Sequence, residues 1–278
     1  MLQSGQRTHI ASRRESLCSS WPAARQSLVA SPLKGVDGNW SSAFDAVVEG
    51  STAYNDPKLQ TAVDKIAELI QQNIKVVVFT QRLETSKALN QLLDNNKIVQ
   101  EKKRKLEKCA QRMYRHVEKI GIWLDIDNQA YAKGVVKVMA HSADCPSNIN
   151  RKSIGNWWRR HKKQIGDGDT DKWIDLKLII GRGRRLPLVV RYDSEVGSDE
   201  RNIDKFNRPS SPLVLIATPK AQEGIDLHHY CRHVVLFDLT WNPAAIEQRI
   251  GRVHRLGGMR KTNEKVVVVY CFQKGTYE

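Results

Sequence analysis

Apolar residues follow a helical rhythm in some parts of the chain and form continuous runs in others. The first helical stretch covers residues 58 to 72 and follows an Asp-Pro pair, which suits the start of a helix. Its apolar positions are Leu59, Val63, Ile66 and Ile70. The β-branched run "KVVVFT" comes next, and "TSKALNQLLDNN" then reads as a second amphipathic helix. Helix, buried strand and helix in this order predict an α/β unit.

The same alternation returns in the second half of the chain. Three further apolar runs read as strands, and a helix is expected to begin at Pro243. The runs cover residues 212–218, 233–239 and 265–272. Strands this apolar predict a mostly parallel sheet with helices on both faces, which is a RecA-like or Rossmann-like α/β fold.

Residues 97–187 interrupt this alternation with basic, largely helical sequence. They contain "VQEKKRKLEKCAQRMYRHVEKI" and the aromatic-basic stretch "NWWRRHKK". Residues 97–191 hold 23 Lys and Arg against 10 Asp and Glu, a surplus of 13 in a chain whose net charge is +15. We therefore expect the positive charge to lie mainly on this insertion, where a polyanion would make contact.

Composition narrows the setting further. A net charge of +15 favours nucleic acid as a partner. No run approaches the roughly 18 apolar residues that a membrane span needs. The five cysteines form no C-x-x-C pair, so neither a disulfide framework nor a zinc knuckle is indicated, and an intracellular compartment is expected. The Arg- and Ser-rich start superficially resembles a transit peptide, but "SLCSSWPAARQSL" also reads as a short helix of a packed connector, which we prefer.

The stretch from Ala217 to Gly258 carries the clearest motif. It reads "ATPKAQEGIDLHHYCRHVVLFDLTWNPAAIEQRIGRVHRLGG", with E-G-I-D-L followed at a fixed distance by Q-x-x-G-R-x-x-R. This closely resembles motifs V and VI of superfamily 2 helicases and translocases, and Swi/Snf-type ATPases are the nearest look-alikes. The run around residues 56–89 resembles the entry helix and motif IV strand of the same proteins.

The resemblance implies a domain organisation. Residues 51–278 would be the second RecA-like lobe of such a motor, interrupted by the basic insertion at 97–187. Residues 1–50 would be the connector between the two lobes. DNA is favoured over RNA as the nucleic acid, and the location would be the cytoplasm, or the nucleus in a eukaryote.

The resemblance also implies roles for individual residues. Arg252 and Arg255 would be the arginine fingers, since a guanidinium stabilises charge on a transferring phosphoryl group. Read as one helix, residues 247–255 place these arginines opposite the apolar residues. Thr218 would contact the phosphate backbone. The residues expected at the nucleotide cleft are Gln248, Glu223, Gly224 and Asp226, with Gly251 allowing close packing of the helix.

Half of an ATPase is absent from the chain. No G-x-x-x-x-G-K-[ST] phosphate loop and no D-E-x-H or D-E-x-D run occurs. ATP is the implied cofactor, with Mg²⁺ held by a first lobe that this chain lacks, so the chain alone is expected to be inactive and to be a fragment of a longer protein. The alternative is a non-catalytic nucleic-acid-binding or scaffold module that keeps the lobe fold.

The aromatic-basic stretch leaves two interpretations open. Its side chains could stack on bases and track phosphates, or its tryptophans could be core or partner-docking residues. The residues concerned are Trp157, Trp158, Arg159, Arg160, Lys162 and Lys163. A zinc site formed by two histidines and two cysteines would need irregular spacing and is disfavoured. Its ligands would be Cys109, His141, Cys145 and His161.

Overall fold

The computed structural model describes most of the chain. The described residues are 19–30, 52–142, 144–165, 187–195, 200–209, 211–218, 225–240, 242–255 and 265–272. All structural statements below concern these residues. The part of the chain that they cover contains no helix long and apolar enough to span a membrane.

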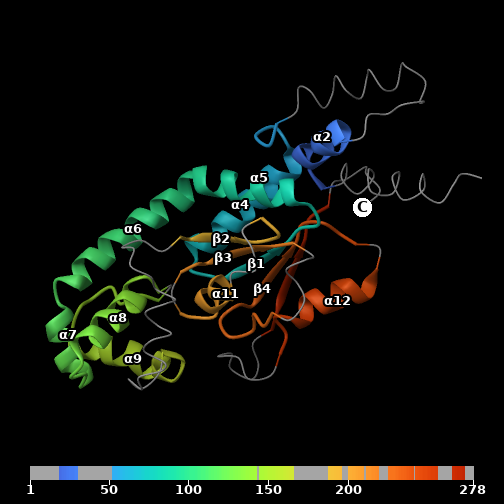
Figure 1. Ribbon diagram of the computed structural model, residues 1–278. Helices are drawn as coiled ribbons and strands as arrows, with labels where there is room; N and C mark the ends of the chain where they lie inside the picture. The colour runs from blue at the N-terminus through green and yellow to red at the C-terminus, as the bar shows by residue number, and fades with distance from the viewer. Residues whose placement is uncertain are drawn as a thin grey trace, which may run out of the picture.

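Five parallel strands form one sheet in the order β2-β3-β1-β4-β5 (Figure 1). Their bounds are Val76–Phe79 (β1), Val189–Tyr192 (β2), Val214–Ala217 (β3), His233–Leu236 (β4) and Val267–Tyr270 (β5). The central strand β1 pairs in register with β3 on one side and with β4 on the other. Because all paired strands are parallel, the chain must cross over between them, as expected for an α/β fold with a RecA-like lobe.

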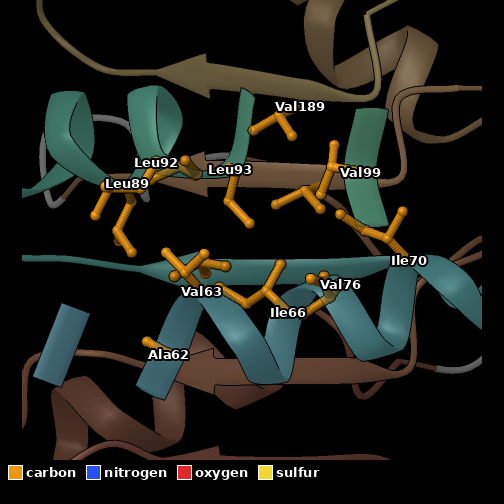
Figure 2. Close-up of a cluster of buried hydrophobic side chains, with 14 of the residues drawn as sticks. Ala62, Val63, Ile66, Ile70, Val76, Leu89, Leu92, Leu93, Val99 and Val189 are labelled. Atoms are coloured by element: carbon orange, nitrogen blue, oxygen red, sulfur yellow. The ribbon is translucent and has the colours of Figure 1, made fainter. Parts of the chain in front are cut away.

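Two helices cover one face of the sheet. Helix α4 (Pro57–Gln71) begins where the Asp-Pro pair predicts, since the Asp56 carboxylate accepts a hydrogen bond from Leu59 N at 3.0 Å. Helix α5 (Leu83–Asn95) packs beside it. Figure 2 shows side chains of both helices meeting Val76 of β1 in a cluster of buried aliphatic residues.

The other face of the sheet has its own core. Val76 and Val78 join the cluster under α4 and α5, while Val77 and Phe79 join a second cluster with helix α11 (Glu200–Phe206). Alternate residues of one strand therefore bury on opposite faces. Val253, which follows helix α12 (Pro243–Gly251), completes this second cluster. The expectation of helices on both faces of a mostly parallel sheet is confirmed.

The two edge strands differ from the sequence-based expectation. The pattern of apolar runs does not predict β2, because this short strand contains Arg191 and is flanked by charged residues. At the sheet edge, Arg191 pairs with Asp193 at 2.7 Å. Strand β5 was expected to be buried on both faces, yet Val267 and Tyr270 are 43% and 48% exposed. A continuous apolar run does not distinguish an edge strand from a central one.

Of the five described helices between β1 and β2, the four that follow α5 extend away from the sheet (Figure 1). They are α6 (Lys97–Tyr114), α7 (Val117–Leu124), α8 (Gln129–Ala140) and α9 (Arg151–Ile165). They enclose a third hydrophobic cluster, which contains Met113, Ile120, Met139 and Trp157. The described part of the basic insertion, through Ile165, is thus largely helical, as predicted, and it has a core of its own.

The N-terminal described segment packs on α5. Helix α2 (Trp21–Ala30) contacts α5, and the hydroxyls of Ser19 and Ser20 each lie 2.7 Å from Thr85 Oγ1. Trp21 N donates to the Asp56 carboxylate at 2.8 Å. The short helix predicted in this region therefore exists, and it is packed against the sheet-covering helices.

A buried lysine lies at the start of β1. Lys75 is 5% exposed, and its Nζ donates to the carbonyls of Phe206 at 2.8 Å and Pro212 at 2.7 Å. Its ammonium group also lies 4.9 Å from the centre of the Phe206 ring. Burial lowers the pKa of Lys75 to about 7. The native protein therefore releases this proton at a lower pH than the unfolded chain does.

Because of Lys75, the free energy of unfolding of the wild type should rise with pH, and we expect the Lys75→Met variant to lack this rise. Between pH 7 and 10.5 the unfolded chain binds the extra proton, so Lys75 makes the free energy of unfolding rise with pH, by up to about 1.4 kcal/mol per unit. Denaturant unfolding at pH 7 and pH 9 would measure the difference between wild type and variant. The exposed Lys65→Met is the control, and the same pH dependence in Lys75→Met and wild type would contradict the prediction.

Candidate functional site

Parallel pairing brings three polar residues to one edge of the sheet. Thr80 follows β1, Thr218 follows β3, and Phe237-Asp238 follows β4. The register aligns Phe79 with Ala217 and with Leu236, so the carboxyl ends of these three strands coincide. In open α/β sheets, ligands bind at this edge.

Helix α12 rises from this edge and starts as predicted. Asn242 Oδ1 accepts a hydrogen bond from Ala244 N at 3.0 Å, and Pro243 occupies the first turn. The helix ends at Gly251, however, so the expectation of one helix through residue 255 is wrong. Arg252 caps it, and the Arg252 carbonyl accepts from Leu227 N at 3.0 Å. The Arg252 carbonyl thus bonds to residue 227, in the segment after β3, and the helix does not continue.

The structure brings together the two segments that carry the predicted motifs. Besides the bond from Leu227 to Arg252, the Arg255 guanidinium forms an ion pair with the Asp226 carboxylate. The Arg255 and Asp226 side chains are 41% and 47% exposed. Asn207 Nδ2 fixes the same segment by donating to the Asp226 carbonyl at 2.6 Å. An ion pair this exposed is weak, so Arg255 can exchange its partner at little cost.

Another arginine of this region, Arg249 in α12, is buried and was not singled out from the sequence. Arg249 is 3% exposed, its Nη1 donates to the Asp238 carbonyl at 3.2 Å, and it lies 6.0 Å from the Phe79 ring centre. Burial lowers the pKa of Arg249, and the charge of Asp238 opposes that shift. The signal was present in the helical spacing, because Arg249 lies on the same side as Ile246 and Ile250.

Asp238 joins this arginine to the sheet. The Asp238 side chain is 4% exposed, and its Oδ2 accepts a hydrogen bond from Gln81 N after β1. Arg249 and Asp238 therefore tie α12 to the ends of β1 and β4. The pair positions the helix that leads into Arg252 and Arg255.

The other residues singled out in the predicted motifs lie in different surroundings. Gln248 is exposed on α12. Gly251 does not provide close packing, because a Cβ placed there would meet no atom within 4 Å, so that expectation is wrong. Thr218 is only 6% exposed, which leaves little of it for a contact with phosphate. Glu223 and Gly224 lie outside the described residues.

Helix α9 separates the aromatic-basic stretch into two faces. Trp157 is fully buried, and its Nε1 donates to Ser142 Oγ and to Asp144 Oδ1, both at 3.0 Å. A buried indole cannot stack on a nucleobase, so the suggestion that Trp157 binds nucleic acid is wrong and the core interpretation is correct. Trp158 is partly buried and meets the Tyr131 ring edge-on, with ring centres 6.5 Å apart.

The opposite face of α9 is cationic and exposed. The helix contains six basic residues and no acidic one. Exposed side chains follow one side of the helix, and they are Arg151, Lys152, Arg159, Arg160, Lys162 and Lys163. Arg160 pairs with Asp144 at 3.0 Å, which orients one of these cations. This face can follow the phosphates of a nucleic-acid backbone.

The buried side of α9 docks on the sheet region through a hydrogen-bonded chain. His161 Nε2 lies 3.0 Å from Asp144 Oδ2, and His161 Nδ1 lies 3.2 Å from the Tyr230 hydroxyl. Burial raises the pKa of the Tyr230 phenol. Tyr230 comes four residues after Asp226. His161 thus links the basic helix to the segment that pairs with Arg255. Among the described residues no group of three or more potential ligands is placed to hold a metal ion.

Residues 182–257 match the helicase conserved C-terminal domain. An uncharacterized ATP-dependent helicase, YqhH, of Bacillus subtilis is 57% identical over 47 residues, which cover 17% of this chain and 8% of that protein. The SNF2 domain-containing protein CLASSY 2 of Arabidopsis thaliana is 37% identical over 100 residues, or 35% of this chain and 7% of that protein. Over the matched residues, the chain is similar to the C-terminal lobe of superfamily 2 helicases of the Swi/Snf-like branch.

A further relative extends the range of similar proteins. The DNA repair protein RAD5 of Cryptococcus neoformans is 37% identical over 93 residues, which cover 32% of this chain and 7% of that protein. The chain therefore spans less than a tenth of the length of each of these three relatives. The domain match begins before β2 and ends after Arg255, so it includes both segments that meet at Asp226 and Arg255 in the helicase lobe.

Two arginines of the helicase lobe should differ sharply in their effect on stability. We expect Arg249→Ala to lower the free energy of unfolding by about 3 kcal/mol or more, because truncation removes the buried cation that opposes the Asp238 charge. Arg255→Ala should cost less than about 1 kcal/mol, because its ion pair is exposed. Denaturant unfolding measures both values. Equal losses would contradict the division into a buried structural arginine and an exposed one.

Proposed function

We propose that this chain is the C-terminal motor lobe of an ATP-dependent nucleic-acid helicase or translocase. The observation that carries the proposal is the meeting of residues 225–227 with residues 252–255, which unites the predicted motifs V and VI. The similarity to an ATP-dependent helicase and to a DNA repair protein supports ATP use and favours DNA over RNA. Such a motor would work in the cytoplasm of a bacterium or the nucleus of a eukaryote.

Arg252 and Arg255 act in this proposal as the arginine fingers. A first RecA-like lobe supplies the phosphate loop and holds Mg²⁺ with ATP, and closure of the two lobes brings the arginines to the γ-phosphate. A guanidinium suits this task because its planar fork of donors is permanently charged. The exposed pair with Asp226 supports the role of Arg255, since replacing a half-exposed carboxylate by phosphate costs little.

The neighbouring polar residues complete the nucleotide side of the proposed site. Gln248 is exposed one helical turn before Arg252 and can reach the same cleft. Asp226 forms the exposed ion pair with Arg255 that a nucleotide phosphate would replace in this proposal. Glu223 and Gly224 keep the roles at the cleft that the family resemblance implies.

The exposed face of α9 is the proposed nucleic-acid contact outside the motifs. It offers Arg159, Arg160, Lys162 and Lys163 in a helix without acidic residues. We also propose the domain organisation expected from the sequence. Residues 1–50 form a connector, and residues 51–278 form a lobe that residues 97–187 interrupt. The separate hydrophobic core of α6 to α9 supports treating that insertion as a unit.

We expect Arg252→Ala, in a protein that also contains the first lobe, to reduce ATP turnover by about 10³-fold or more while nucleotide binding persists. The reason is that an arginine finger stabilises the transition state and adds little to ground-state binding. Steady-state phosphate release and binding of a fluorescent ATP analogue measure the two quantities. Lys108→Ala, on exposed α6, is the control, and normal turnover by Arg252→Ala would overturn the assignment.

A triple variant of α9 tests the nucleic-acid face. Arg159→Ala, Lys162→Ala and Lys163→Ala together should weaken binding of duplex DNA by this chain and lower the salt dependence of binding, by about 0.9 in log–log slope per lost phosphate contact. Fluorescence anisotropy at several salt concentrations, with DNA and RNA duplexes, measures both effects.

A matched variant on α6 separates a specific face from total charge. Arg104→Ala, Lys105→Ala and Lys108→Ala remove the same number of charges from exposed positions. We expect these changes to affect binding much less. Equal loss in the two triple variants would show that net charge alone attracts the nucleic acid, and would count against the α9 face.

A further inference from the structure

One carboxylate oxygen of Asp144 bonds to two consecutive residues of α9. Arg160 Nη1 and His161 Nε2 each lie 3.0 Å from Asp144 Oδ2, while Asp144 Oδ1 accepts a hydrogen bond from Trp157 Nε1. The Arg160 side chain is 58% exposed on the basic face of the helix, whereas His161 is buried. The same oxygen atom therefore connects the exposed face of α9 with its buried side.

The bond to Asp144 sets the direction of the hydrogen bond between His161 and Tyr230. Burial opposes ionisation of Asp144, but the hydrogen bond from His161 and the nearby positive charge outweigh it, so the pKa of Asp144 is lowered. An ionised carboxylate accepts hydrogen bonds and donates none, so His161 Nε2 carries the proton. In the neutral ring Nδ1 is then an acceptor, and the Tyr230 hydroxyl, 3.2 Å away, donates to it.

Tyr230 ends the segment in which the two predicted motifs meet. Within residues 225–230, Leu227 N donates to the Arg252 carbonyl at 3.0 Å. Leu227 is fully buried in the hydrophobic cluster on the second face of the sheet. A change in how firmly Tyr230 is held can therefore reach the backbone bond between the two motifs across three residues of chain.

We propose that Arg160, Asp144, His161 and Tyr230 form a relay that couples nucleic-acid binding on α9 to the contact between the two motifs. The inference rests on the proposed function, in which the basic face of α9 binds phosphates. A phosphate competes for Arg160, because the Arg160–Asp144 ion pair is exposed and weak. Once Arg160 turns to a phosphate, Asp144 Oδ2 no longer shares its charge between two donors. The hydrogen bond from His161 then strengthens, and His161 holds Tyr230 more firmly.

The relay needs a part with two arrangements, and Arg160 supplies it. Its partner is either the Asp144 carboxylate or a phosphate, so binding and the position of Tyr230 are linked in both directions. A pocket of about 270 Å³ borders Asp144, His161 and Tyr230, which gives these side chains room to shift. His161 and Tyr230 act as positioning residues, because they change the motif contact without touching the nucleic acid.

Hydrogen–deuterium exchange of the chain without nucleic acid tests the relay itself. Arg160→Ala releases the Asp144 oxygen as a phosphate would, so we expect exchange in residues 225–230, which include the bonded Leu227 amide, to slow by about fivefold or more. Arg159→Ala is the matched control, because Arg159 is also exposed on α9 but donates to Asn156. Unchanged exchange in Arg160→Ala would overturn the relay.

The same measurement with duplex DNA tests the coupling. DNA should slow exchange in residues 225–230 of the wild-type chain by a similar factor. Tyr230→Phe removes the hydroxyl and keeps the ring, so it should bind DNA with unchanged affinity and lose most of the slowing. Tyr54→Phe, whose hydroxyl accepts from Asn95 Nδ2 instead, should respond like the wild type. If Tyr230→Phe fails to fold, the wild type and Arg160→Ala still decide the question.

The outcomes separate the relay from the function on which it rests. DNA binding without slower exchange in residues 225–230, or equal slowing in Tyr230→Phe, would overturn the coupling and leave the basic face of α9 intact. A wild-type chain that binds no DNA would instead overturn that basic face, and the coupling with it.

Discussion

The in-register pairing of β1 with both β3 and β4 is the constraint on which the rest of the lobe depends. Because all three strands are parallel, their carboxyl ends meet at one edge, and the residues that follow them are brought within reach of one another. Asp238 comes from one strand end and Gln81 from another, and their hydrogen bond closes that edge. The strand order, with β1 in the middle, places sequence-distant segments side by side.

Arg249 fixes α12 to this edge of the sheet through its hydrogen bond to the Asp238 carbonyl. A buried guanidinium is stable only with hydrogen-bond acceptors and an opposing charge, and the Asp238 residue supplies both. The guanidinium lies in the last turn of the helix, and its bond to Asp238 holds that end against the strand edge despite the cost of desolvation. The exposed Arg255 can then meet Asp226 in a weak pair that a stronger anion can replace. The buried Arg249 therefore holds the helix in place, while in the proposed function the exposed Arg255 changes its partner from Asp226 to a phosphate.

The helical insertion adds a second unit that is linked to the same site. Its basic face points away from its core, while Trp157 and His161 on the other side of α9 bond to Asp144 and Tyr230. Amphipathicity divides one helix between an exposed basic face and the protein interior. Because Tyr230 follows Asp226 closely, the insertion and the two motifs meet in one short segment of chain.

The sequence alone determined those features that depend on local spacing. Helical periodicity and the Asp-Pro and Asn-Pro starts predicted α4 and α12, and continuous apolar runs predicted four of the five strands. The spacing of Q-x-x-G-R-x-x-R identified the arginine-rich segment and the family. These signals are local, because helix caps and side-chain periodicity involve residues within a few positions of one another.

Tertiary structure decided what depends on distant neighbours. The sequence did not separate the buried Arg249 from the exposed Arg255, nor the core Trp157 from a stacking residue, because burial depends on which segments cross over each position. It missed β2 and misjudged β5, because edge position follows from sheet order. The contact of Asp226 with Arg255 likewise exists only once the parallel sheet has formed, since long-range packing alone brings those side chains together.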